Sequence, residues 1–331
     1  NLQAPAHLLP FTAARLPTVQ DEGIKVWMRA RDEARDRLKR KDPEGVFLAI
    51  ANIDTGGQSL QIGEWLDLEP LEASPLVYGT ESMKLSGPKH QLFFSDTVNE
   101  ETLRWPEPAL VGLFRTATAL LRIATSGFIV AGDFSNRSWD IVDGLPSDAK
   151  PFLHSTGGRY RAWWPIGPVL ITQDDCDYAS TSLFPCLRLG QNRAFKLALE
   201  SFDTSFQEED LRMAASKVWA GIEALFNINS ELRYRLSLYI STVLHGPGGQ
   251  REAEYRRLVK LYDQRSKVVH GSSIDADKLL EHVLAAQATL SGLLAAAISA
   301  ERMWTGEEVE RALLGGTPLF EARRDDPSPA D

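Results

Sequence analysis

Short apolar runs broken by turn residues follow one another through the first half of the chain. They have the length and the β-branched and aromatic content of strands, and occupy residues 46–53, 59–68, 91–96, 128–133 and 163–171. One longer stretch, 108–127, instead places Leu110, Leu113, Phe114 and Leu121 near one another on a helical projection. Residues 1–190 are therefore expected to form an α+β domain with a mostly antiparallel sheet.

A charge-dense segment precedes these strands. Within residues 21–42, Glu33 lies four positions before Arg37 and Asp36 four before Arg40. Pairs at this spacing stabilise a solvated helix. Its basic residues would also suit nucleic acid, but the interleaved acids favour a solvent-exposed helix face.

Strand patterns stop near residue 190, and helical patterns follow. The helix-like segments are 194–202, 211–227, 231–245, 251–269 and 277–304. Short connections at 245–250 and 271–276 are typical of antiparallel neighbours in a bundle. We predict an all-α bundle over residues 191–315. The polar, proline-containing segment 316–331 is expected to be a loose tail.

Composition narrows the class of protein. The 331 residues are too many for most single cores, so two domains are expected. A net charge of -9 and a pI near 5.3 argue against a chain that binds nucleic acid over its whole surface, so an RNA site would have to be local. The first residues lack the pattern of a signal peptide, and no unbroken apolar run of about 18 residues is present.

Two cysteines, Cys176 and Cys186, are too far apart for a Cys-x-x-Cys zinc or redox motif. A disulfide between them stays open, but two half-buried free thiols in a reducing cytoplasm are the simpler expectation. We therefore expect a cytoplasmic protein that does not enter a membrane.

The first domain offers only weak site patterns. Asp54-Thr55-Gly56 resembles an aspartic protease loop, but no second copy exists to share a proton, so a hairpin turn is predicted. The group Asp174, Asp175 and Asp177 has oxygen ligands for a divalent cation, yet a solvated loop is the better interpretation.

The isolated histidines of this domain, which are His7, His90 and His154, lack partners at metal-ligand spacing and are expected to be structural or exposed. No paired acid and base or nucleophile supports a hydrolase in this domain. Its ligand is not indicated by the sequence.

Residues 253–270 carry the most informative pattern. Projected at about 100° per residue, Arg265 falls in the middle of an apolar arc. That arc contains Leu258, Leu261, Tyr262 and Val269. An unpaired guanidinium is costly to bury, so Arg265 is expected to have an acid, a ligand or a dimer partner.

The opposite face of this helix is basic. Arg256, Lys260 and Lys267 share it, and His270 falls nearby if the helix persists. Between Arg251 and His270 there are six Lys or Arg and three Asp or Glu, so the segment carries 6 - 3 = +3 within a chain of -9. A positive segment within a negative chain suits an anionic ligand. We expect Arg256, Lys260 and Lys267 to bind RNA.

His270 is followed by Gly271, a common residue just beyond a helix end. The negative end of the helix dipole favours a protonated imidazole, whereas Lys267 opposes it. A histidine under both influences suits proton exchange near neutral pH. Elsewhere in the bundle, His245 is expected to end a helix and His282 to be exposed.

The six residues from Arg265 to His270 resemble the Arg-x4-6-His signature of HEPN ribonucleases. Together with WAGIEALFN and ELRYRLSLYISTVL, the block LYDQRSKVVHG resembles the Apea-type HEPN domain of bacterial phage-defence proteins, over residues 191–300. The resemblance implies that Arg265 and His270 are catalytic and that Glu223 is the acidic partner of Arg265. Ser266 departs from the Asn, Asp or His that many members carry there, which bears on auxiliary proton transfer or substrate positioning.

The resemblance implies a metal-independent RNA endonuclease in anti-phage defence, abortive infection or toxin activity, needing no cofactor. It further implies a homodimer through the helical domain, with a phage-derived or nucleotide signal bound by the first domain. The alternative is a non-catalytic HEPN module that binds nucleotides or RNA, or that dimerises.

Overall fold

The computed structural model describes residues 45–64, 66–72, 89–94, 108–145, 153–154, 167–208, 210–226, 228, 231–269 and 274–320. The predicted helix at 21–42, His7 and the end of the expected tail lie outside these ranges. The chain divides into two compact units, Asn1–Thr181 and Ser182–Asp331. The division falls inside a helix, whereas the sequence pattern places it at residue 190.

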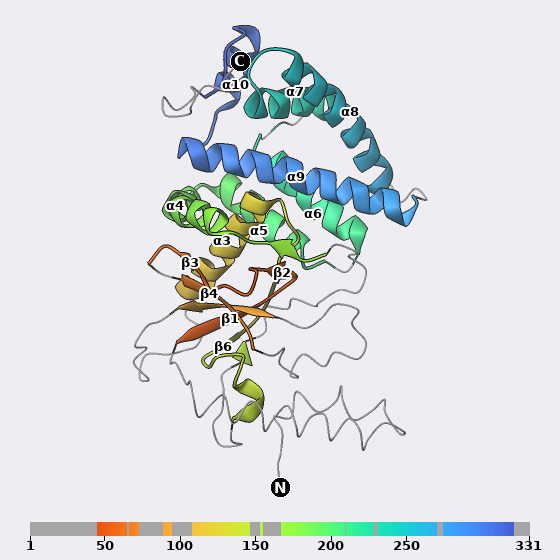
Figure 1. Cartoon of the computed structure of the whole chain (residues 1–331). Helices are drawn as coiled ribbons and strands as arrows, with labels where there is room; N and C mark the ends of the chain where they lie inside the picture. The colour runs from red at the N-terminus through yellow and green to blue at the C-terminus, as the bar shows by residue number, and fades with distance from the viewer. Residues whose placement is uncertain are drawn as a thin grey trace. The chain divides into compact units, whose positions relative to one another are not determined.

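Six of the described strands of the first unit form an antiparallel sheet in the order β3-β4-β5-β1-β6-β7 (Figure 1). Their bounds are β1 Val46–Ala51, β3 Leu60–Ile62, β4 Leu66–Pro70, β5 His90–Phe94, β6 Val130–Ser135 and β7 Leu153–His154. Every residue of β1 is buried, and because successive side chains point to opposite faces, both faces of the sheet are covered at this strand. The predicted antiparallel sheet is confirmed.

Helix α3, Pro108–Thr125, matches the predicted helix and packs against this sheet. The ring of Phe114 meets that of Phe134 in β6 edge-on, with centroids 5.3 Å apart. Arg122 is 1% exposed and donates through Nε to the carbonyl of Ile129 at 2.9 Å. A short 3₁₀ helix, η3 (Val142–Gly144), follows β6.

The predicted hairpin at Asp54 is wrong, although the turn itself forms. Gly56 and Gly57 have positive φ angles of 63° and 75°, and the Gly56 amide donates to Oδ1 of Asp54 at 2.8 Å. However, the short strand β2, Ile53–Asp54, pairs in parallel with β8, Val169–Leu170, while β3 pairs with β4. Asn52, with φ at 63°, redirects the chain between β1 and β2, so the strands that flank the turn have different partners.

The predicted loop at Asp174 to Asp177 is also wrong, because these residues begin helix α4, Gln173–Leu189. Acidic side chains near a helix N-terminus interact favourably with the helix dipole, which explains a helix where the polar run indicated a loop. Oδ2 of Asp175 accepts hydrogen bonds from the amide and hydroxyl of Thr172 at 2.8 and 2.7 Å. Pro185 lies inside the helix.

The second unit is helical, as predicted. Its helices are α5 Arg193–Ser205, α6 Leu211–Ala224, α7 Leu232–Leu244, α8 Gly249–Val269, α9 Ala276–Ala300 and α10 Gly306–Leu314. Polar residues that precede four of these helices accept hydrogen bonds from first-turn amides, and they are Asn192, Asp210, Asp275 and Thr305. The separate helix α10 is absent from the expected pattern.

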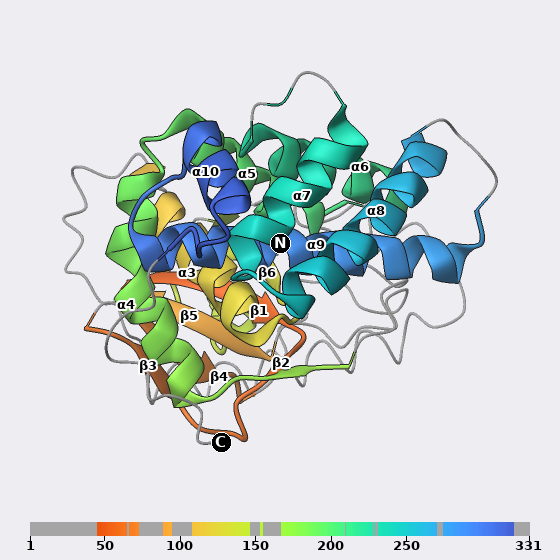
Figure 2. The same ribbon diagram turned by 90° about the horizontal axis from the view of Figure 1, so that it is seen from above.

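Helix α9 runs through the bundle, with α7, α8 and α10 on one side and α5 and α6 on the other (Figure 1). Seen from above, α7 and α8 lie next to each other across it (Figure 2). Residues 276–300 are, by length and composition alone, long and apolar enough to cross a membrane. Leu290, Leu293 and Leu294 are fully buried, as in the core helix of a bundle. This burial accounts for the apolar sequence.

Candidate functional site

Arg265 of α8 and Glu223 of α6 form the predicted ion pair. Nη2 of Arg265 lies 2.8 Å from Oε1 of Glu223, and the two side chains are 24% and 28% exposed. The apolar arc around Arg265 is also confirmed, since Leu258 and Leu261 are 1% and 5% exposed. Burial raises the pKa of Glu223 and the nearby Arg265 lowers it, with burial the larger effect.

Both members of the pair have buried polar atoms without a hydrogen-bond partner in the described part of the chain. The approach of Nη2 to Oε1 lacks the angles of a hydrogen bond, and Nε of Arg265 is buried without a hydrogen-bond partner in the described part of the chain. A guanidinium carries five N–H donors on three nitrogens, and the contact with Glu223 involves only Nη2. Donors therefore remain at Arg265 for an anionic ligand.

One aromatic ring lies beside the guanidinium. Its central carbon lies 5.4 Å from the ring centroid of Tyr262, which is one helical turn earlier in α8. The ring of Tyr262 in turn meets Trp219 of α6 edge-on, at 5.5 Å and 86°. Trp219 is 1% exposed, so the aromatic side of the site is fixed in the bundle core.

His282 of α9 continues this cluster, and its predicted exposure is wrong because only 2% of it is accessible. Nε1 of Trp219 donates to Nε2 of His282 at 3.1 Å. Burial lowers the pKa of His282 to about 4, so the imidazole is neutral and its proton lies on Nδ1. Leu279 and Ala286, at helical spacing on either side, are buried too and indicate the inward face.

The three predicted RNA-binding cations, Arg256, Lys260 and Lys267, are exposed on α8. Arg256 is paired with Glu252 one turn earlier at 2.5 Å, whereas neither lysine has an acidic group within 4.0 Å among the residues that the structure describes. Ion pairs this exposed contribute little stability, so Arg256 can exchange Glu252 for another anion.

Asp263 of the same helix belongs to a different contact. Arg233 of α7 holds it with two hydrogen bonds of 2.6 and 2.7 Å. This hydrogen bonding lowers the pKa of the Asp263 carboxyl, and Lys267 adds a smaller effect. The main partner of this carboxylate is therefore Arg233 of α7, and its interaction with Lys267 is weaker.

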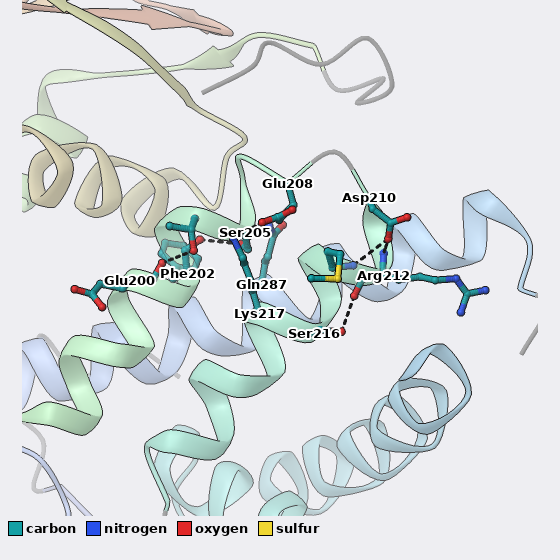
Figure 3. A network of polar contacts seen from close by, with 11 residues as sticks. Glu200, Phe202, Ser205, Glu208, Asp210, Arg212, Ser216, Lys217 and Gln287 are labelled. Atoms are coloured by element: carbon teal, nitrogen blue, oxygen red, sulfur yellow. Dashed lines mark hydrogen bonds and ion pairs between the residues drawn. The ribbon is translucent and has the colours of Figure 1, made fainter. Parts of the chain in front are cut away.

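Helix α8 ends at Val269, so His270 is the next residue in the chain and lies outside the described ranges. Ser266 is half-buried. Nη1 of Arg212 in α6 donates to the carbonyl of Val268 at 2.8 Å, placing a cation at the negative end of α8. Figure 3 shows the Arg212 side chain extending away from Asp210, whose carboxylate instead accepts from the first amides of α6.

The remaining predicted residues have structural positions. His245 ends α7, as expected, its amide donating to Ser241 at 3.0 Å. His90 is buried, with Nε2 lying 3.2 Å from Oγ1 of Thr55. Burial is the main cause that lowers the pKa of His90. His154 lies in β7.

The two cysteines are free and fully buried rather than half-buried. Burial raises the thiol pKa of Cys176 and of Cys186 to about 12, which makes both unreactive. Within the described ranges, no group of three or more His, Cys, Asp or Glu residues is arranged to hold a metal ion.

The sequence analysis does not predict two features of the site, which are the aromatic cluster and the contact of Arg212 with α8. The cluster of Tyr262, Trp219 and His282 joins three helices, and only the helical spacing of each residue among apolar neighbours hinted at its burial. Arg212 has no local sequence signal, because its contact with Val268 spans 56 residues.

Comparison of the chain with known protein families, characterised proteins and solved structures gives no match.

Proposed function

We propose that the helical unit is a metal-independent RNA endonuclease of the HEPN type, with Arg265 and His270 as its catalytic pair. The observation that supports this most is Arg265 itself, a cation held on an apolar helix face by Glu223 with Nε lacking a hydrogen-bond partner in the described part of the chain. Five residues later in the chain stands a histidine, as in the signature that this segment resembles.

The residue types suit cleavage by the RNA's own 2′-hydroxyl. The 2′-oxygen attacks the phosphorus, the bond to the 5′-oxygen breaks, and the products carry a 2′,3′-cyclic phosphate and a 5′-hydroxyl. His270 transfers a proton at one of the two oxygens. Arg265 donates to the phosphate oxygens and stabilises their growing negative charge. No metal is needed for either role.

Lys260 and Lys267 suit binding of the RNA backbone, since both are exposed on α8 and unpaired within the described residues. Arg256 joins them once its weak pair with Glu252 opens. The contribution of such contacts falls as salt rises, because phosphate binding releases counterions. RNA binding through this helix is therefore expected to be salt-dependent despite the chain's charge of -9.

We further propose a homodimer in which Arg265 of one chain and His270 of the other serve one phosphate. In a helical projection of the sequence, five residues correspond to a rotation of about 140°, so one straight helix would not readily direct both side chains at the same group. A two-fold interface brings identical faces together and solves this problem. The first unit is then proposed to sense a phage-derived or nucleotide signal in anti-phage defence.

The second candidate is a non-catalytic HEPN module that binds nucleotides or RNA, or dimerises. The ion pair favours this second candidate, because Glu223 compensates the charge of Arg265 without any bound RNA. Buried or half-buried ion pairs that bridge helices are common in proteins with no site nearby. The two functions differ in whether loss of Arg265 stops a reaction or only loosens a helix contact.

Incubation of the purified chain with total RNA, with and without EDTA, tests the proposal. We expect cleavage in both conditions and none with Arg265→Ala. Arg233→Ala is the matched control, because it removes an ion pair between α7 and α8 but leaves Arg265 in place. Loss of cleavage in EDTA, or equal cleavage by Arg265→Ala, contradicts the proposal.

A further inference from the structure

The guanidinium of Arg265 is in contact with residues from two helices of the bundle. Glu223 of α6 contacts Nη2 at 2.8 Å, and the Tyr262 ring of α8 lies 5.4 Å from the guanidinium carbon. A long side chain held by one ion pair can still rotate about that contact. An aromatic face beside a planar cation restricts this rotation, because attraction to the ring depends on where the cation lies over it.

The Tyr262 ring is itself fixed from outside its own helix. Trp219 meets it edge-on at 5.5 Å and 86°, an arrangement that aromatic pairs favour. Trp219 cannot readily turn, since Nε1 donates to His282 of α9 at 3.1 Å and the two rings stack at 6.1 Å. The contacts thus run without a gap from α9 through α6 to α8.

We propose that Tyr262 is the positioning residue for Arg265, and that Trp219 and His282 hold Tyr262 in place from α6 and α9. An effect of Tyr262 on catalysis rests on the proposed function. The restraint of the guanidinium by Tyr262 does not depend on any reaction. The alternative is that the three rings only fill the core beside an arginine that Glu223 alone restrains.

Tyr262→Leu and Tyr262→Phe separate these alternatives, because both keep an apolar side chain and only the second keeps the ring. Tyr255→Leu is the matched control. Tyr255 is also on α8 and also meets another tyrosine edge-on, Tyr234 at 6.2 Å, but it is almost three turns from Arg265.

The direct measurement is the Nε–Hε signal of Arg265 in a side-chain nitrogen–proton NMR spectrum, assigned by its loss in Arg265→Lys. The ring current of Tyr262 should displace this signal from the position of a free arginine. We expect Tyr262→Leu to return it toward that position, and Tyr262→Phe and Tyr255→Leu to leave it in place. An unchanged signal in Tyr262→Leu overturns the proposal. If Tyr262→Leu fails to fold by circular dichroism, the flexible replacement Tyr262→Met serves in its place.

The effect on catalysis is measured as the cleavage rate of an RNA oligonucleotide. This oligonucleotide carries a cleavage site that has first been mapped in total RNA. We expect Tyr262→Leu to lower kcat roughly ten-fold with little change in KM, since it disturbs a group that acts in the transition state. Tyr262→Phe should restore the wild-type kcat. Equal kcat for wild type and Tyr262→Leu overturns the proposal. If the wild type itself cleaves nothing, the proposed function fails, and the NMR signal still decides whether Tyr262 positions Arg265.

Discussion

Trp219 and His282 form a buried hydrogen bond of 3.1 Å in which the indole is the donor. The imidazole must stay neutral to accept it, because a protonated ring would turn an N–H toward the N–H of Trp219. His282 is 2% exposed, and Nδ1 has no hydrogen-bond partner in the described part of the chain. A positive charge here would be poorly compensated.

Stability is therefore expected to fall in acid. The pKa of His282 is about 4 in the folded protein against 6.5 for the unfolded side chain. The unfolded chain takes up the proton first, so the contribution of His282 is complete above pH 6.5 and is lost as the pH falls toward 4. The full loss is about 3 kcal/mol. Urea unfolding at pH 7 and pH 4.5 measures it, with His282→Gln as control. An equal pH dependence in both proteins contradicts the assignment.

Close packing of α6 between α5 and α9 predicts a sharp difference between two glycines. A Cβ on Gly221 would lie 2.9 Å from Cβ of Ser201 and 3.0 Å from Cδ2 of Leu290. Gly221→Ala is expected to cost about 1–3 kcal/mol of unfolding free energy by overpacking. Gly292→Ala of α9 meets only the flexible end of Leu244, at 3.1 Å. We expect it to be neutral or stabilising, because alanine favours helix. Similar unfolding midpoints would contradict this packing.

A double-mutant cycle measures the contact between Arg265 and Glu223. Because both side chains are partly buried, we expect a coupling of about 1 kcal/mol from Glu223→Gln and Arg265→Met, above that of a fully exposed pair. The control is Arg233 with Asp263, whose side chains are 57% and 48% exposed, so solvent screens this pair more strongly and its coupling is expected to be smaller. A coupling near zero for Arg265 and Glu223 would mean that the pair does not hold α6 to α8.

Periodicity predicted most of the bundle, because apolar faces at helical spacing depend on local sequence. The segment 251–269 lies within α8, and the arc that contains Arg265 and Leu258 is buried as projected. The partner Glu223 was indicated only through the resemblance. A lone histidine gives no sign of burial by itself, and the signal for His282 lies in the buried residues three and four positions away.

Strand pairing was less accessible to sequence reasoning. The turn at Gly56 and Gly57 was predicted, but the pairing of β2 with β8 joins residues more than a hundred positions apart. The acidic run at Asp174 suggested a loop because charge alone does not distinguish a loop from a helix N-terminus. Contacts of this range depend on the whole fold.

Mixed dimers test whether two chains share a site. Arg265→Ala and His270→Ala chains, inactive alone, are expected to regain activity when mixed, because each heterodimer restores one composite site. Random exchange would return about a quarter of the wild-type sites. The shared site is contradicted if activity does not return after subunit exchange has been verified. It is also contradicted if the wild type is fully active at a concentration at which sedimentation shows only monomer.

Cleavage of RNA by wild type and by His270→Ala tests the central claim most directly. In EDTA, the wild type is expected to release fragments that end in a 2′,3′-cyclic phosphate and a 5′-hydroxyl. His270→Ala is expected to release none while keeping the circular dichroism of the wild type, since replacing a residue just beyond a helix end usually costs little stability. Undiminished cleavage by His270→Ala, or products with a 5′-phosphate, would contradict the account.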